Sequence, residues 1–354
     1  MKRQTDRRRS WARLALGSVA FAVLLAGSAQ RAGAREVEDM HGRKVVVPER
    51  IERVFATSLP ATYLVYAIDP QLVAGLNSPQ REGERRYTVP HMRSIPVIGG
   101  VSGMGRMINQ EVLLAAKPDV IVVWDFNETV MLGEYEAVFR RMGIPWVYVQ
   151  ADTVWDYPEA LAALGKMLGR QARGRELRKR AREMLAGVKA AVAAVPLSAR
   201  PKVYYAEGPD GLSTEGRGSF HTELIEVAGG HNVHTGTPVR GRGMERISLE
   251  QVMGYDPEVI LIKERTFYNS IYKDPRWANL SAVRDRRVFL IPNDPFNWFD
   301  RPPSFMRLLG AQWLLGALQP GRLSPDIRTQ MKSFYGFFLG VSIDDRQTTE
   351  ILGP

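Results

Sequence analysis

Short apolar runs alternate with amphipathic stretches along most of the chain from about residue 52 onward. Residues 120–123 and 259–262 are continuous apolar runs rich in Val and Ile, a pattern typical of strands buried in a parallel sheet. Residues 53–56, 146–149 and 202–205 predict further short strands. Because helical stretches separate these runs, the pattern predicts an α/β fold.

One helix-and-strand unit occurs twice. In residues 108–123 and 247–262, an Ile lies ten residues and a Glu seven residues before a Pro that precedes the apolar run. Asn109 and Ser248 stand at the expected helix starts, where their side chains can cap the first turn. The copies lie 139 residues apart, which is too long for a solenoid repeat and indicates two similar lobes.

A charged helical stretch joins the two copies. Apolar residues recur three or four apart from Leu161 to Val195, and Pro196 follows. We interpret its many basic residues as a solvated helix face. The sequence therefore predicts two Rossmann-like lobes joined by a single long helix, with a ligand cleft between the lobes. The expected segments are a signal peptide (1–34), an N-terminal α/β lobe (35–155), a helical connector (156–198) and a C-terminal α/β lobe (199–354).

Charge changes this picture mainly at the N-terminus. Of the formal net charge of +10, residues 1–34 contribute seven Lys and Arg against one Asp. These residues also hold an apolar run over 14–27 and the small-residue sequence Ala32-Gly33-Ala34, so we expect an export signal cleaved near Ala34 and a periplasmic protein. An uncleaved anchor is the alternative. The remaining mild positive charge gives no strong case for nucleic acid.

Cysteine is absent from all 354 residues. This excludes thiolate catalysis, cysteine metal sites and a lipoprotein anchor, so stability must come from apolar cores. His231 and His234 lie three residues apart but follow two glycines, which favours a loop over a metal site. The sequence predicts no metal ligands and no cofactor.

Ligands of open α/β sheets lie beyond the carboxyl ends of the strands. Aromatic and cationic side chains follow several predicted strands, and such groups suit an anionic or chelated ligand. The residues that we expect to bind the ligand are Thr57, Ser58, Arg106, Trp124, Arg240, Arg242, Lys263, Arg265, Tyr268, Trp298 and Arg301.

The doubled unit, the joining helix and the export signal together resemble the cobalamin and ferric-siderophore type of periplasmic binding protein. The resemblance covers nearly all of residues 35–335 and includes residues 39–43, 224–233 and 302–314. It implies delivery of the ligand to a membrane permease with a cytoplasmic ATPase, and contact with the membrane only through that permease. It also implies that Glu111 and Glu250 pair with arginines of the permease; first-turn stabilisation of their helices is the alternative role.

These features predict a monomeric binding protein of an ABC importer that captures an iron–siderophore-type metal chelate. Corrinoid, haem and a molybdate-like oxyanion are the alternative ligands. An exported enzyme or an envelope sensor on the same fold is the alternative class. The chain contains no nucleophile elbow, dinucleotide-binding loop, Walker-type loop or zinc-protease motif, so catalysis is not expected.

Overall fold

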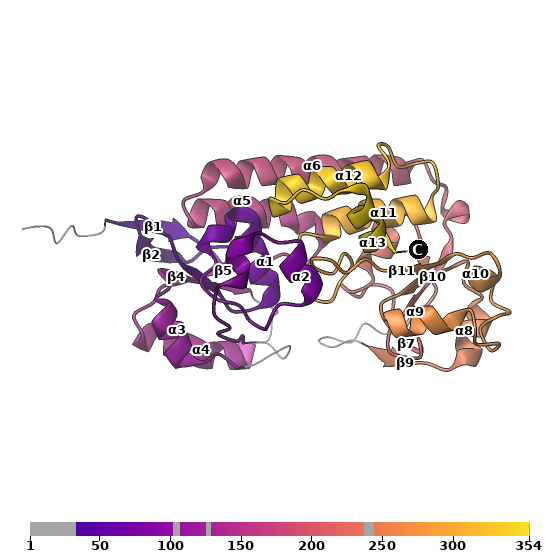
Figure 1. Cartoon of the computed structure of the whole chain (residues 1–354), viewed down its shortest axis with the longest axis horizontal. Helices are drawn as coiled ribbons and strands as arrows, with labels where there is room; N and C mark the ends of the chain where they lie inside the picture. The colour runs from indigo at the N-terminus through magenta and orange to yellow at the C-terminus, as the bar shows by residue number, and fades with distance from the viewer. Residues whose placement is uncertain (1–32, 102–106, 125–128, 237–243, 354) are drawn as a thin grey trace, which may run out of the picture.

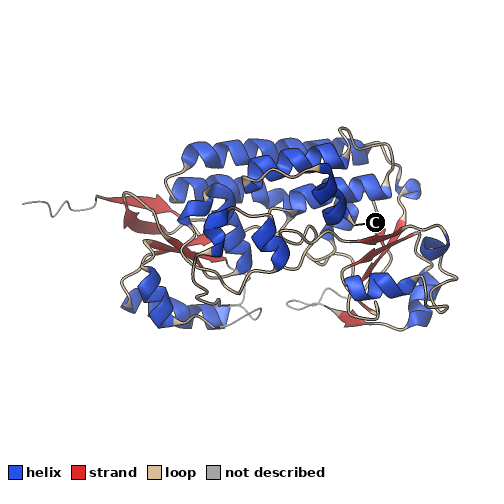
Figure 2. Ribbon diagram, viewed as in Figure 1, coloured by secondary structure: helices blue, strands red, loops and turns tan. Residues whose placement is uncertain are grey.

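The computed structural model describes residues 33–101, 107–124, 129–236 and 244–353. Two parallel sheets lie at opposite ends of the molecule, and one layer of long helices runs across both of them (Figure 1). Figure 2 shows the strands of the two ends as separate groups beneath this layer. The predicted α/β fold with parallel sheets is confirmed.

The N-terminal sheet has the order β3-β4-β5, and all its strands are parallel. An antiparallel hairpin of β1 (Ala34–Glu38) and β2 (Lys44–Pro48) precedes it. Residues 72–76, which have strand-like composition, form only isolated bridges. The strands of the sheet are β3 (Val54–Ala56), β4 (Val120–Trp124) and β5 (Trp146–Val149).

The C-terminal sheet has the order β11-β10-β6-β8 and is also parallel. A short antiparallel ribbon of β7 (Ser213–Thr214) and β9 (Glu245–Arg246) lies beside it. The strands of the sheet are β6 (Lys202–Ala206), β8 (His231–Asn232), β10 (Val259–Ile262) and β11 (Val288–Leu290).

Helices cover both faces of each sheet. In Figure 1, α5, α6, α11 and α12 form the common layer, whereas α3 and α4 cover the outer side of one sheet and α8 and α9 that of the other. None of the helices in the described ranges combines the length and the apolar character that a bilayer span requires. The helices are α1 (Leu59–Ile68), α2 (Glu82–Arg86), α3 (Gln110–Ala116), α4 (Thr129–Arg141), α5 (Tyr157–Met167), α6 (Gln171–Ala193), α7 (Glu223–Val227), α8 (Leu249–Tyr255), α9 (Arg265–Ile271), α10 (Ser281–Arg284), α11 (Arg307–Leu318), α12 (Ile327–Phe334) and α13 (Asp345–Leu352).

Alternate strand residues enter different cores, because successive side chains of a strand point to opposite faces. Val120 and Val122 of β4 belong to one large apolar cluster, whereas Ile121 and Val123 belong to a smaller cluster under α3 and α4. In β10, Val259 and Leu261 join the same large cluster, whereas Ile260 and Ile262 join a third cluster under α8 and α9. The sequence predicts two cores, but the structure has two outer cores and one that is continuous between the lobes.

The connector contains two helices rather than one. Helix α5 packs on the N-terminal sheet, and α6 contacts α1 of one lobe and α7 and α11 of the other. Gly165 and Gly174 let the two helices approach closely, because a Cβ on Gly165 would lie 2.7 Å from the Gly174 Cα. The predicted single helix is therefore corrected to a helical hairpin whose second member, α6, bridges the lobes.

The end of the chain returns to the N-terminal lobe. The Tyr66 hydroxyl of α1 donates to the Leu339 carbonyl (2.6 Å), and the Arg173 guanidinium donates to the Phe337 carbonyl (2.5 Å). Arg86 of α2 forms an ion pair with Glu350 of α13 (2.9 Å). The last part of the expected C-terminal lobe, 199–354, therefore also contacts the N-terminal lobe.

Both copies of the doubled unit have the same kind of capping hydrogen bond at the start of their helix. Asn109 Oδ1 accepts from the Val112 amide (3.0 Å) at the start of α3, and Ser248 Oγ accepts from the Gln251 amide (3.2 Å) at the start of α8. Both seven-residue helices end in a left-handed residue, at φ values of 46° and 40°. The predicted starts of these helices are confirmed.

Candidate functional site

Buried polar groups follow the carboxyl ends of β3 and β6, one strand from each sheet. Thr57 and Ser58 follow β3, and Glu207 follows β6. Lys263 follows β10, the neighbour of β6. Parallel strands put these carboxyl ends along one edge of each sheet, which is the usual ligand position in α/β folds. We call the region around Thr57 and Ser58 the N-terminal strand end, and the region around Glu207 and Lys263 the C-terminal strand end.

Ser58 is the central residue of the N-terminal strand end. It caps α1 with extended backbone angles (φ −148°, ψ 160°), but its side chain makes no capping hydrogen bond. The Ser58 Oγ is buried, with the residue only 5% exposed, and has no hydrogen-bond partner among the described residues. A hydroxyl at a helix start that the helix does not use suits an anion, although Pro60 leaves the first turn of α1 with one amide donor fewer.

A buried amide side chain, Asn77, holds this strand end in place. Its Nδ2 donates to the Ala56 carbonyl (2.8 Å) and the Gly99 carbonyl (3.0 Å), and its Oδ1 accepts from the Thr62 hydroxyl (2.7 Å). A Cβ on Gly100 would lie 2.8 Å from the Thr57 carbonyl, so the loop packs tightly there. Sequence reasoning missed Asn77, because nothing local distinguishes it from a turn residue.

The C-terminal strand end is built from buried charges. Glu207 and Asp300 are fully buried and Glu215 is 1% exposed. The Arg301 Nε lies 3.0 Å from Glu207 Oε1 and 3.3 Å from Asp300 Oδ2, and its Nη2 donates to Glu215. Lys263 Nζ lies 3.8 Å from Glu207 Oε1. Arg301 and Lys263 thus neutralise carboxylates of their own lobe.

Two further side chains complete this charge cluster. His221 Nδ1 lies 3.0 Å from Asp300 Oδ2, and the Tyr205 hydroxyl donates to Asp300 Oδ1 (2.8 Å). Sequence reasoning missed Glu215, His221 and Asp300, because they meet only in the fold. Tyr205 and Asp300 are 95 residues apart along the chain.

The proton affinity of Glu207 follows from this environment. Burial, and after it the neighbouring Asp300 carboxylate, raise the pKa of Glu207 to about 6, against the opposing effect of the nearby cationic side chains. Its Oε2 is buried and has no hydrogen-bond partner in the described ranges. Glu207 therefore takes up a proton in mildly acidic solution.

The remaining predicted ligand residues are partly inside and partly outside the described ranges. Arg265 is exposed at the start of α9, and Tyr268 is half-buried in the same helix. Trp124 is 5% exposed, and its ring centroid lies 6.4 Å from that of Tyr157 within the large core. Arg106, Arg240 and Arg242 lie outside the described residues.

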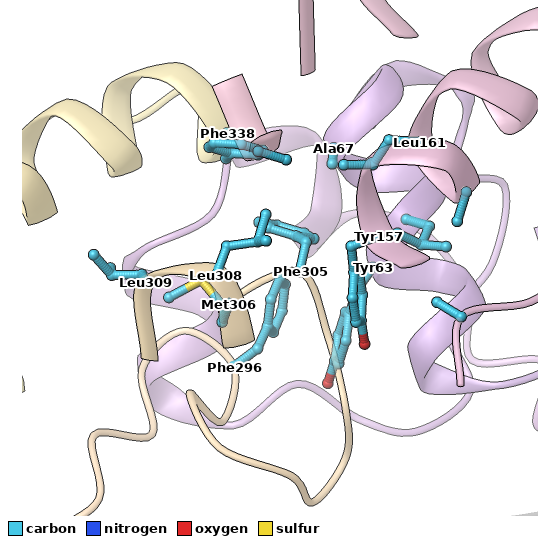
Figure 3. Close-up of a cluster of buried hydrophobic side chains, with 14 of the residues drawn as sticks. Tyr63, Ala67, Tyr157, Leu161, Phe296, Phe305, Met306, Leu308, Leu309 and Phe338 are labelled. Atoms are coloured by element: carbon cyan, nitrogen blue, oxygen red, sulfur yellow. The ribbon is translucent and has the colours of Figure 1, made fainter. Parts of the chain in front are cut away.

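The prediction for Trp298 needs correction. Trp298 is 0% exposed, and its Nε1 donates to the Asp294 carbonyl (3.0 Å), so its ring packs in the core and offers no surface to a ligand. Phe296 of the same segment stacks on Tyr63 of α1 at a centroid distance of 3.7 Å (Figure 3). This aromatic segment joins the two lobes, because apolar rings from both meet there.

Polar contacts strengthen the junction between the lobes. Arg81, just before α2, donates to the carbonyls of Asn293 (3.1 Å) and Pro295 (2.7 Å). Glu223 accepts from the Val154 amide (3.0 Å) and pairs with the buried guanidinium of Arg307 (2.5 Å).

A surface hollow of about 490 Å³ lies near Arg81. It is lined by Gln80, Glu82, Arg85, Arg86 and Arg93. These residues belong to α2 and its surroundings rather than to the strand ends.

The two predicted docking residues occupy matching places. Glu111 lies in the first turn of α3 and Glu250 in the first turn of α8, and both are exposed. In Figure 1, α3 and α8 lie along the same edge of the molecule, opposite the common helical layer.

His231 and His234 have separate partners: His234 Nε2 lies 2.6 Å from Glu245 Oε2, and His231 Nε2 lies 2.8 Å from Arg217 Nη2.

Comparisons with known proteins agree with this architecture. Residues 87–295 match the profile of a family described as periplasmic binding protein. The chain is 28% identical to the molybdate-binding protein MolA of Haemophilus influenzae, over 87% of this chain and 92% of that protein. It is 26% identical to the vitamin B12-binding protein of Salmonella typhi, over 65% of this chain and 78% of that protein.

A solved structure has the same fold. The ABC transporter solute-binding protein from Sulfurospirillum deleyianum is 37% identical, with a TM-score of 0.82, covering 90% of this chain and 98% of that protein.

Proposed function

Because the chain belongs to the periplasmic binding protein family, we propose that it is the extracytoplasmic binding protein of an ABC importer for a tetrahedral oxyanion of the molybdate type. The family consists of binding proteins, not enzymes, so the function is capture and delivery without chemistry. The export signal expected over residues 1–34 is part of this proposal.

The observation that carries the choice of ligand is the unused hydroxyl of Ser58. Ser58 Oγ is buried at the start of the ten-residue helix α1, at the edge where α/β folds bind ligands. Helix amides and a hydroxyl donate hydrogen bonds to an oxyanion and complement its negative charge. Thr57 places a second hydroxyl residue beside it.

The cationic groups of the other lobe fit this proposal only indirectly. Arg301 and Lys263 are engaged by three buried carboxylates, Glu207, Glu215 and Asp300, so the C-terminal strand end carries no excess of positive charge. A ligand there meets a polar, preorganised wall rather than a strongly cationic one. Arg106, Arg240 and Arg242 remain proposed contacts, and so do Arg265 and Tyr268.

A large ligand is less well supported than a small one. The sequence favours a ferric siderophore partly because aromatic residues follow the last strand of the C-terminal lobe. Phe296, Trp298 and Phe299 are 2%, 0% and 1% exposed, so these rings fill the core between the lobes. A corrinoid, a haem or a siderophore needs a wide apolar surface that these rings do not supply. The relative named for molybdate also matches more of the chain than the relative named for vitamin B12.

Ligand titrations test this choice. Isothermal titration and thermal unfolding with molybdate, tungstate, sulfate, a ferric siderophore, cyanocobalamin and haemin compare all candidates on one protein. At a molybdate concentration about 100-fold above its Kd, we expect stabilisation by about 2.7 kcal/mol. Stabilisation by cyanocobalamin, haemin or the ferric siderophore, with none by molybdate or tungstate, would contradict the oxyanion.

The Ser58→Ala variant tests the proposed contact. We expect its molybdate affinity to fall about tenfold, or about 1.4 kcal/mol, because one hydrogen bond to a charged ligand is lost. Ser94→Ala is the matched control, since the exposed Ser94 hydroxyl donates only to the His91 carbonyl of a surface turn. Equal affinities of the two variants would remove Ser58 from the site.

Docking to the permease is the second part of the proposal. Glu111 and Glu250 supply one acidic group per lobe on the same edge of the molecule, which suits a partner that offers two cationic groups. We expect a Glu111→Lys, Glu250→Lys variant to abolish uptake while ligand affinity stays unchanged. Uptake at the wild-type rate would show that the two carboxylates only stabilise their helices.

A further inference from the structure

Two exposed apolar side chains stand at equivalent positions of the doubled unit. Leu114 of α3 is 51% exposed and Met253 of α8 is 45% exposed. Each lies three residues after the glutamate of its helix, Glu111 or Glu250, and residues three apart share a helix face. Each helix therefore presents an acidic and an apolar side chain together to solvent.

Packing inside the lobes does not explain these residues. Leu113 and Val252, the neighbours that face the outer cores, are 0% exposed and fill the same place in each lobe. An exposed position next to them gains nothing from an apolar side chain during folding. The repetition of an apolar residue at this place in both lobes therefore points to a contact made with another molecule.

Further apolar side chains gather around the same helix starts. Within the described ranges, eight large apolar residues are strongly exposed, and four of them precede or belong to α3 and α8. The other two of these four are Met107, 60% exposed and four residues before Glu111, and Met244, 50% exposed and six residues before Glu250. Methionine suits such a surface because its flexible side chain adapts to a partner's pocket.

We infer that Leu114 and Met253 are the apolar anchors by which this protein docks on its permease, each inserted beside the cationic group that pairs with the neighbouring glutamate. The inference rests on the proposed importer function. Because the two surfaces repeat each other on one edge of the molecule, the partner offers the same pocket twice, as two identical permease subunits do (Figure 1). A second copy of this chain is a poor partner for these surfaces, since both carry an acidic group and like charges would repel.

Binding to the permease–ATPase complex in nanodiscs tests the anchors directly. We expect Leu114→Ser and Met253→Ser each to weaken this binding about tenfold, and the double variant about 100-fold, as for buried apolar residues at interface centres. The melting temperature and the molybdate affinity should not change, because neither side chain packs inside a lobe. Leu197→Ser is the matched control, since Leu197 in η4 (Leu197–Ala199) is 79% exposed and lies outside the doubled unit.

The absence of cysteine makes a second measurement possible. The variants Leu114→Cys, Met253→Cys and Leu197→Cys each accept one environment-sensitive fluorophore. On addition of the nanodiscs, we expect the emission to shift to shorter wavelengths at 114 and 253 but not at 197.

The outcomes separate this inference from the proposed function. Wild-type binding by the double Ser variant, together with loss of binding by the Glu111→Lys, Glu250→Lys variant, would overturn the anchors and leave docking intact. Wild-type binding by both variants would overturn docking as well. A dimer of the wild-type chain in light scattering that the double Ser variant abolishes would assign the surface to a second copy and overturn the permease as its partner.

Discussion

The N-terminal and C-terminal strand ends occupy equivalent places in two similar sheets, but their chemistry differs. The N-terminal strand end offers neutral donors, with the Ser58 hydroxyl left without a partner in the described structure. The C-terminal strand end holds three buried carboxylates, Glu207, Glu215 and Asp300, around the Arg301 guanidinium. At the outer helices, by contrast, the caps, the glutamates and the exposed apolar residues match from lobe to lobe.

This contrast indicates that the permease and the ligand place different requirements on the two lobes. A partner that repeats itself requires matching surfaces on both lobes, and α3 and α8 match. A small ligand between the lobes has no internal repeat, so the two strand ends are free to differ. We infer that one end contributes hydrogen-bond donors to the ligand and the other a rigid, polar wall.

Removing the guanidinium at the centre of the C-terminal strand end has the largest expected effect on stability. In Arg301→Met, the Glu207 and Glu215 carboxylates stay buried without their main cation, and the free energy of unfolding falls by about 3–5 kcal/mol. Urea unfolding measures this loss. Arg276→Met is the control, because the exposed Arg276–Asp274 pair contributes less than about 1 kcal/mol. Similar losses in the two variants would mean that the cluster is open to water.

The charge of Glu207 gives a smaller effect that depends on pH. Burial raises the pKa of Glu207 to about 6 in the fold, above its ordinary value of 4.5, so the folded protein binds this proton more tightly than the unfolded chain does. Glu207 therefore contributes stability that is complete below pH 4.5 and is lost as the pH rises through 6, on the order of 1–2 kcal/mol.

Urea unfolding of the wild type and of Glu207→Gln at pH 4.5 and pH 7 measures this term. The stability of the wild type relative to the variant should decrease between the two pH values. Parallel pH profiles would show that Glu207 is not desolvated by the cluster.

The smallest expected effect on stability is at the N-terminal strand end. Ser58→Ala should change the free energy of unfolding by less than about 0.5 kcal/mol, because the buried Ser58 Oγ has no hydrogen bond to lose. Ser304→Ala is the buried control: its Oγ accepts from the Met306 amide (3.1 Å), and we expect a loss of about 1 kcal/mol. A larger loss for Ser58→Ala than for Ser304→Ala would place Ser58 in a structural role.

Much of the fold could be predicted from the sequence, because its signals are local. The apolar runs at β4 and β10, the caps at Asn109 and Ser248 and the spacing of the doubled unit depend on residues within a few positions of each other. Such patterns reflect strand pleat, helix period and first-turn hydrogen bonds, which a short segment determines alone.

The candidate site could be predicted only in part. Thr57, Ser58 and Lys263 follow predicted strands, and the structure places them at the strand ends. The rest needed the tertiary structure, because its contacts join distant segments. Arg301 meets Glu207 and Glu215 across 94 and 86 residues, which turns a predicted ligand contact into part of a buried ion cluster.

Contacts between distant segments also explain why the aromatic segment is buried and why one core is continuous between the lobes. Phe296 stacks on Tyr63 across more than 200 residues, and the large apolar cluster takes alternate residues from both sheets. The amino-acid sequence by itself determined the strands, the capped helices and the duplication. Only the tertiary structure decided which side chains stay available to a ligand, since burial depends on what the rest of the chain packs against each of them.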